Sequence, residues 1–126
     1  MVFSPEDFKY SHHHLWVKPD GRVAVVGITE DLHDQLKDVQ SVDLPMEADE
    51  LEPDTECMTF HLKTGLYDIM SPLTGRIVST NKRLILNPSK MLIAPYTDGW
   101  LFKMEYDEPE ELELLMSSEE YSAMTA

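Results

Sequence analysis

The chain has 126 residues, of which 42% are hydrophobic, so it is long enough for one domain with its own core and too apolar for a disordered chain. Asp and Glu number 24 against 10 Lys and Arg, and the formal net charge of −14 repels nucleic-acid phosphates and favours encounters with basic patches on proteins. No apolar run approaches the length of a membrane span, which is about 18 residues, and no signal-peptide pattern opens the chain. The single Cys57 excludes an internal disulfide. We therefore expect a cytoplasmic protein without nucleic-acid or membrane partners.

The first half of the chain predicts short strands separated by turns. Ser4, Pro5 and the acids after them have the order of a short helix start. Thr29 has the residue type of a helix cap. The expected elements are strands over 15–17 and 22–28, a helix over 30–37, a strand over 40–44 and an acidic, turn-rich connection over 47–56.

The second half continues the same pattern. The expected elements are strands over 58–62, 66–70 and 76–80, a connector over 81–86, a turn over 87–90, an apolar run over 91–95, a loop over 96–99 and a strand over 100–106. Many short strands with turns every few residues favour an all-β sandwich or barrel-like fold with short flanking helices. We expect residues 1–126 to form a single domain whose tail, about 107–126, is helical.

The hairpin over 58–70 is the most informative segment for function. Lys63 is the one basic residue between positions 58 and 75, and it lies in the short turn Lys63-Thr64-Gly65. Residues 62–65 fit a type I turn followed by a left-handed glycine, which would expose Lys63 at the apex. A lysine at a hairpin tip offers an amine for a swinging cofactor, but a lysine in a turn is also common, so its surroundings must decide.

Other chemistry-bearing residues indicate a carrier or binding module rather than an enzyme. The run His12-His13-His14 on an extended chain would point to alternating faces, so we expect no metal site there, and Cys57, His61 and His33 are the only other soft or imidazole donors. Cys57 is expected to be a small buried hydrophobe. No phosphate-binding glycine loop, nucleophile elbow or paired-cysteine motif is present. The aromatic segment 96–106 could be a docking surface, but we favour a core strand.

The order of several motifs resembles the H protein of the glycine cleavage system. The matching residues are Lys9-Tyr10-Ser11, Trp16, Val26-Gly27-Ile28-Thr29, Val42-Asp43-Leu44-Pro45, Asp68-Ile69, Ser71-Pro72, Gly75-Arg76-Ile77-Val78, Asn81, Leu84, Asn87-Pro88, Pro95-Tyr96 and Gly99-Trp100-Leu101-Phe102-Lys103. The resemblance implies a lipoyl-domain-like barrel-sandwich hybrid that carries lipoate on a hairpin lysine. It also implies a non-catalytic carrier in glycine catabolism, whose arm visits a decarboxylase, an aminomethyl transferase and a flavin-dependent dehydrogenase.

The departures from that family cluster at the hairpin. Counting without gaps from Pro45, or backwards from Asp68, puts the family's modified lysine at Thr64, one residue after Lys63. The family's glutamate three residues before the lysine corresponds to His61, and its His-Glu-Trp motif becomes His14-Leu15-Trp16. The residue that the family is thought to present to the aminomethyl amine is therefore apolar in this chain.

These observations lead to one principal interpretation and two alternatives. The principal one is a monomeric lipoyl carrier that is modified on Lys63 by a lipoyl ligase, with His61, Thr64 and Gly65 around the arm. It would shuttle an aminomethyl group or electrons between partner enzymes of the glycine cleavage system or a related lipoate-dependent complex. One alternative is a non-lipoylated paralogue with an interaction or regulatory role. The other is a lipoate carrier for a different pathway such as sulfur-compound oxidation, where no amine needs a counter-charge.

Overall fold

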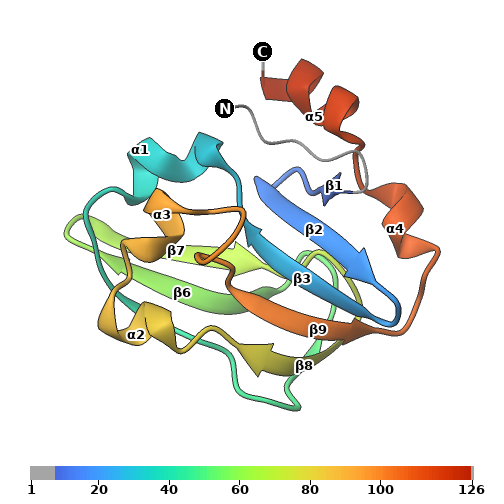
Figure 1. The fold of residues 1–126 in the computed structure, drawn as a ribbon, viewed down its shortest axis with the longest axis horizontal. Helices are drawn as coiled ribbons and strands as arrows, with labels where there is room; N and C mark the ends of the chain where they lie inside the picture. Colours follow the sequence, from blue (N-terminus) through green and yellow to red (C-terminus); the bar gives the residue numbers. More distant parts are fainter. Residues whose placement is uncertain (1–7, 126) are drawn as a thin grey trace.

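The structure is a computed structural model that describes residues 8–125, and it consists of two antiparallel sheets with short helices at their edges (Figure 1). The expected helix start at Ser4 lies outside the described residues. In the larger sheet the strands run in the order β1-β2-β3-β9-β8-β5, and in the smaller one in the order β4-β6-β7. This arrangement confirms the all-β sandwich with short flanking helices.

The strands are β1 Lys9–Tyr10, β2 Leu15–Asp20, β3 Val23–Ile28, β4 Val39–Asp43, β5 Glu50–Leu51, β6 Glu56–Leu62, β7 Gly65–Met70, β8 Gly75–Thr80 and β9 Phe102–Tyr106. The helices are the 3₁₀ turn η1 Glu30–Leu32 and the α-helices α1 His33–Leu36, α2 Arg83–Leu86, α3 Lys90–Ile93, α4 Glu111–Leu114 and α5 Ser118–Thr125. No helix within residues 8–125 is long and apolar enough to cross a membrane.

The larger sheet is organised around a tryptophan that lies over a glycine. Trp16 on β2 is the cross-strand partner of Gly27 on β3, and a Cβ at Gly27 would lie only 2.4 Å from the indole ring. The indole N–H donates to the carbonyl of Pro95 at 2.9 Å, which anchors the segment after α3 to the sheet. Glycine is therefore required at position 27 because only its missing side chain leaves room for the ring.

The smaller sheet shows the alternation that its sequence predicts. Met58 and Phe60 on β6 are buried in the core, whereas the intervening Thr59 and His61 point to the other face. Strand side chains alternate between the two faces, so burying Phe60 on one face fixes the outward direction of its neighbours. The hairpin that carries Lys63 is thereby held by the core through its inner face.

Several sequence expectations about local structure were wrong or incomplete in detail. The helix over 30–37 is a 3₁₀ turn followed by one α-turn that ends at Leu36, and Thr29 makes no side-chain cap. The connection over 47–56 contains β5, which pairs with β8. The connector over 81–86 and the apolar run over 91–95 contain α2 and α3. The last strand begins at Phe102 rather than at Trp100.

The C-terminal segment folds back over the first strand. Tyr121 on α5 stacks on Tyr10 with ring centroids 4.8 Å apart, and Tyr10 also exchanges backbone hydrogen bonds with Met116. Figure 1 shows α5 above β1 at the edge of the larger sheet. Burial of both tyrosine rings holds the tail against the sheet.

Candidate functional site

Lys63 and Thr64 form the two-residue tip of the β6–β7 hairpin. Leu62 pairs with Gly65 across the turn, and both tip side chains are exposed. Neither tip residue has a positive φ, so the turn is not one of the mirror-image types I′ or II′. The expected exposure of Lys63 at the apex is confirmed, and its amine is open to a modifying enzyme.

Gly65 differs from the expected left-handed glycine. Its φ is +142°, beyond the left-handed helical region near about +57°. A Cβ added at Gly65 would meet no heavy atom within 4 Å, so the backbone angle and not lack of space demands glycine. The glycine therefore lets the second strand begin directly after Thr64.

His61 is tied to the neighbouring strand rather than to the tip. Its Nε2 lies 2.7 Å from Asp43 Oδ2 on β4. On the same face Thr59 donates to Asp68 Oδ1 at 3.0 Å. The outer face of the smaller sheet thus carries a row of polar contacts behind the tip, and the cross-strand partner of His61, Leu66, is 68% exposed.

Leu15 and His14 occupy different environments although they are adjacent. Leu15 is fully buried in the core. His14 has a φ of +66°, which turns its side chain towards the tail, where Nδ1 lies 2.8 Å from the Tyr121 hydroxyl. That hydroxyl donates to Asp31 Oδ2 at 2.7 Å and lies 2.7 Å from Thr29 Oγ1.

This four-residue network connects the Asp31 carboxylate to His14 through the Tyr121 hydroxyl. Asp31 is two hydrogen bonds away from His14, although the two are distant from Tyr121 in sequence. Burial is the main cause that raises the pKa of Tyr121, so its hydroxyl stays a hydrogen-bond donor at neutral pH. Sequence reasoning missed Tyr121 and Asp31 because the tail must fold back before they meet.

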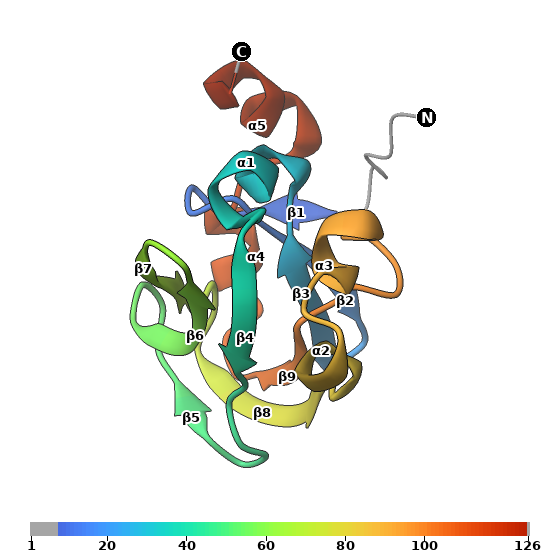
Figure 2. The same cartoon turned by 90° about the vertical axis from the view of Figure 1, so that its left-hand side faces the viewer.

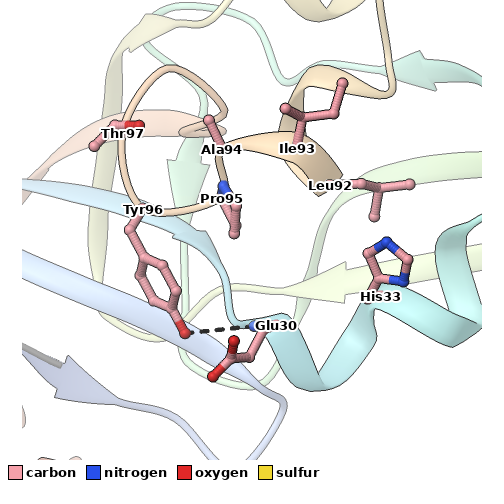
Figure 3. Close-up of a pocket in the computed structure, with 8 residues that line it drawn as sticks. All are labelled: Glu30, His33, Leu92, Ile93, Ala94, Pro95, Tyr96 and Thr97. Carbon is pink, nitrogen blue, oxygen red and sulfur yellow. Dashed lines mark hydrogen bonds between the residues drawn. The ribbon is translucent and has the colours of Figure 1, made fainter. Parts of the chain in front are cut away.

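An open hollow of about 670 Å³ lies at the end of the molecule that holds α1 and α3 (Figure 3). Glu30 and His33 line one side, and residues 92–97 line the other. The Tyr96 hydroxyl accepts a 3.4 Å hydrogen bond from the Glu30 backbone N–H, and burial raises the pKa of Tyr96 to about 12. Within the aromatic segment 96–106, the expected core strand is confirmed around Phe102, which is buried. Tyr96, at the start of this segment, instead borders the hollow.

The hollow and the hairpin tip lie at the same end of the molecule. Figures 1 and 2 show α1, α2 and α3 gathered at the end where β6 turns into β7. The hollow combines a carboxylate, an imidazole and an apolar wall that includes Ile93, which is 74% exposed. Such a mixture suits contact with a partner protein or with a small polar group on an apolar arm.

Cys57 and the histidine run are the remaining candidate residues. Cys57 is half-buried, and burial, followed by the charge of Glu56, raises its pKa to about 12, so the thiol is the inert hydrophobe that the sequence predicts. The expectation that the histidine run is extended was wrong. His12 and His13 lie in a turn, and both direct a ring nitrogen towards Asp54.

Comparisons with known proteins agree with this fold. The family model described as glycine cleavage H-protein matches residues 8–126. The chain is 40% identical to the glycine cleavage system H protein of Staphylococcus epidermidis over 121 residues, 95% of each chain. It is 36% identical to that of Halothermothrix orenii over 118 residues, 94% of this chain and 92% of the relative. The crystal structure of a glycine cleavage system H protein from Mycobacterium marinum has a TM-score of 0.82 at 26% identity, covering 96% of this chain and 98% of that one.

Proposed function

This chain belongs to the glycine cleavage H-protein family of lipoyl carriers, and from that premise we propose that its lipoyl group is attached to Lys63. The observation that carries the proposal is the exposed lysine at the tip of a two-residue turn. Lys63 is also the one lysine of the β6–β7 hairpin. An amide to its Nζ would place the arm at the exposed tip of the β6–β7 hairpin.

The residues around the tip fit such an arm. The hairpin is fixed to the core through Phe60 and Ile69, which are both buried, so the attachment point is rigid while the lysine side chain is free to swing. When bound, the dithiolane of lipoate supplies the redox and group-transfer chemistry. The protein contributes position, because an arm on a fixed point raises the effective concentration of its end at each partner enzyme.

The partners proposed for this carrier are the enzymes of the glycine cleavage system, together with a lipoyl ligase. The net charge of −14 favours docking on basic patches of these proteins. The cargo is an aminomethyl group or electrons. Asp31 accepts a hydrogen bond from the Tyr121 hydroxyl that also contacts His14, and it is our candidate for the role of the missing family glutamate.

A second candidate is a lipoate-free paralogue that acts through protein contacts. The observation in its favour is Thr64, which occupies the gapless family position of the modified lysine. His61 adds to it, since this residue replaces the family glutamate and is bound to Asp43. In this alternative the scaffold and the acidic surface persist, and Lys63 is an ordinary surface residue. Neither candidate makes the chain itself a catalyst.

The two candidates differ in what a lipoyl ligase does to the purified chain. The assay incubates the full-length protein with lipoate, ATP and a ligase, and follows intact mass. Three variants accompany it: K63A, K63R, and the exchange K63T/T64K that moves the lysine to the family position. We expect one adduct on the wild type, none on K63A or K63R, and one on the exchange variant.

The exchange variant separates a poor scaffold from a misplaced lysine. If only K63T/T64K is modified, the scaffold is competent and Lys63 is not the attachment point, which rejects the proposal and favours the lipoate-free paralogue. If K63A still gains an adduct, another lysine is the substrate. Circular dichroism of each variant checks that the fold is intact, and exposed tip substitutions are expected to leave it unchanged.

A further inference from the structure

Three potential metal ligands from two distant segments meet at the edge of the larger sheet. His12 and His13 lie in the turn between β1 and β2, and Asp54 lies in the loop between β5 and β6, 41 residues after His13. One donor atom from each side chain lies within 4.8 Å of the other two. The two imidazole rings are stacked at a tilt, with centroids 4.0 Å apart.

The distances are those of a nearly formed coordination site. Two ligand atoms at about 2.0–2.1 Å from a tetrahedral ion are about 3.3 Å apart. His13 Nε2 lies 3.1 Å and His12 Nε2 lies 3.8 Å from the same carboxylate oxygen of Asp54. Changes of less than an ångström in side-chain position would therefore satisfy both distances.

The backbone on both sides holds the three side chains in place. The buried Ser11 hydroxyl accepts hydrogen bonds from the backbone N–H groups of His13 and Leu15, which fixes the turn that presents the two histidines. On the other side the Asp54 backbone N–H donates to the Ser71 carbonyl at 2.9 Å. The cluster is thus supported by interactions that do not involve the ligand atoms themselves.

Another acid that borders this surface is already bound elsewhere. Ser11, His12 and Asp54 border a small recess together with Glu111. Both Glu111 carboxylate oxygens are bound to Thr74, one to its backbone N–H at 2.8 Å and one to its hydroxyl at 2.7 Å. The cluster therefore offers three protein ligands and leaves a fourth coordination position open to solvent.

We propose that His12, His13 and Asp54 form a binding site for a divalent transition-metal ion, with Zn²⁺ as the best match. Two imidazole nitrogens and one carboxylate oxygen suit Zn²⁺, Cu²⁺ and Ni²⁺, whereas Mg²⁺ and Ca²⁺ prefer all-oxygen ligands. Water completes the coordination. A bound ion links the β1–β2 turn to the β5–β6 loop, and it does so apart from the hairpin that carries Lys63.

The test titrates Zn²⁺ into the untagged full-length protein by isothermal calorimetry, with Mg²⁺ as the comparison ion. We expect one Zn²⁺ per chain and no Mg²⁺ signal. The variants H13A and D54N are expected to weaken binding at least about tenfold, because H13A removes a ligand nitrogen and D54N removes the negative charge of the carboxylate ligand. D54N keeps the residue type that best tolerates the positive φ of +61° at this position, so its backbone is preserved.

The matched control is H33A, which removes another exposed histidine that also has a carboxylate neighbour, Asp34. It is expected to leave the Zn²⁺ affinity unchanged. Imidazole NMR signals report the site directly: those of His12 and His13 should shift on titration, and that of His33 should not. Failure of the wild type to bind Zn²⁺, equal affinity in D54N and the wild type, or equal loss in H33A would each overturn the proposal.

Discussion

Removal of the Tyr121 hydroxyl tests how the C-terminal tail is held against the sheet. In Y121F the ring still stacks on Tyr10, so the change deletes only the hydroxyl contacts. These are the hydrogen bond to Asp31 and the 2.7 and 2.8 Å contacts to Thr29 and His14. Thr29 is fully buried, and in Y121F its side-chain hydroxyl would keep only the longer 3.3 Å hydrogen bond to Asp31 Oδ2.

The expected cost follows from these contacts. A hydrogen bond to a charged group contributes about 1.5–3 kcal/mol, and we take about 2 kcal/mol because Asp31 is exposed to solvent. Unfolding entropies of about 2.1 cal/mol/K per residue convert this to a fall in Tm of roughly 8 °C for a chain of this length. The free energy of unfolding should fall by the same amount in urea, with an unchanged m-value.

The pH dependence gives this prediction a second readout. Burial raises the pKa of Tyr121 above its ordinary 10.0, so the neutral hydroxyl is favoured in the folded state. Its contribution is fully present below pH 10 and is lost as the pH rises through the higher folded value. The stability gap between wild type and Y121F should therefore be constant between pH 8 and pH 10 and narrow above pH 10.

Thermal melts followed by circular dichroism are the assay, and Y67F is the matched control. Tyr67 is half-buried, and its hydroxyl makes no hydrogen bond to another residue in the described part of the chain, so Y67F should change Tm by less than about 2 °C. If Y121F melts within 2 °C of the wild type while Y67F does the same, the tail is not held by this network.

Three further outcomes follow from the core and its edges. Burial, followed by the charge of Glu56, raises the pKa of the Cys57 thiol to about 12. This thiol should therefore react with iodoacetamide at pH 8 at least about tenfold more slowly in the folded protein than in urea-unfolded protein. Equal rates would contradict its burial. G75A should lose about 3 kcal/mol or more in urea unfolding, since the new Cβ would lie 2.0 Å from the Glu105 carbonyl oxygen, and a wild-type midpoint would refute that contact. F60A should lose about 3–5 kcal/mol, and a loss below 1 kcal/mol would show that Phe60 is not a core residue.

Local patterns predicted the hairpin well. The strands expected over 58–62 and 66–70 are Glu56–Leu62 and Gly65–Met70, because alternation and turn chemistry depend on neighbouring residues only. The exposed position of Lys63 followed from the same local signals. The detail that failed was Gly65, whose φ is set by the pairing of Leu62 with Gly65 rather than by turn type alone.

Contacts between distant segments could not be predicted in this way. Pairing of β5 with β8 turns two residues of an acidic connection into a strand. His12 and His13 meet Asp54 only because the turn reverses at His14, whose positive φ is uncommon for a residue with a side chain. Tyr121 reaches Asp31 across 90 residues, so nothing in the local sequence marks either residue.

Peptide mass spectrometry of protein purified from its native host is the decisive measurement of whether Lys63 carries the lipoyl group. Lys63 and Thr64 are adjacent at the tip, and only the lysine offers an amine, so fragment ions that separate the two residues assign the position. We expect the peptide containing Lys63 to bear one lipoyl amide on that residue. An unmodified Lys63 throughout the population, or a lipoyl group on a different lysine, would contradict it.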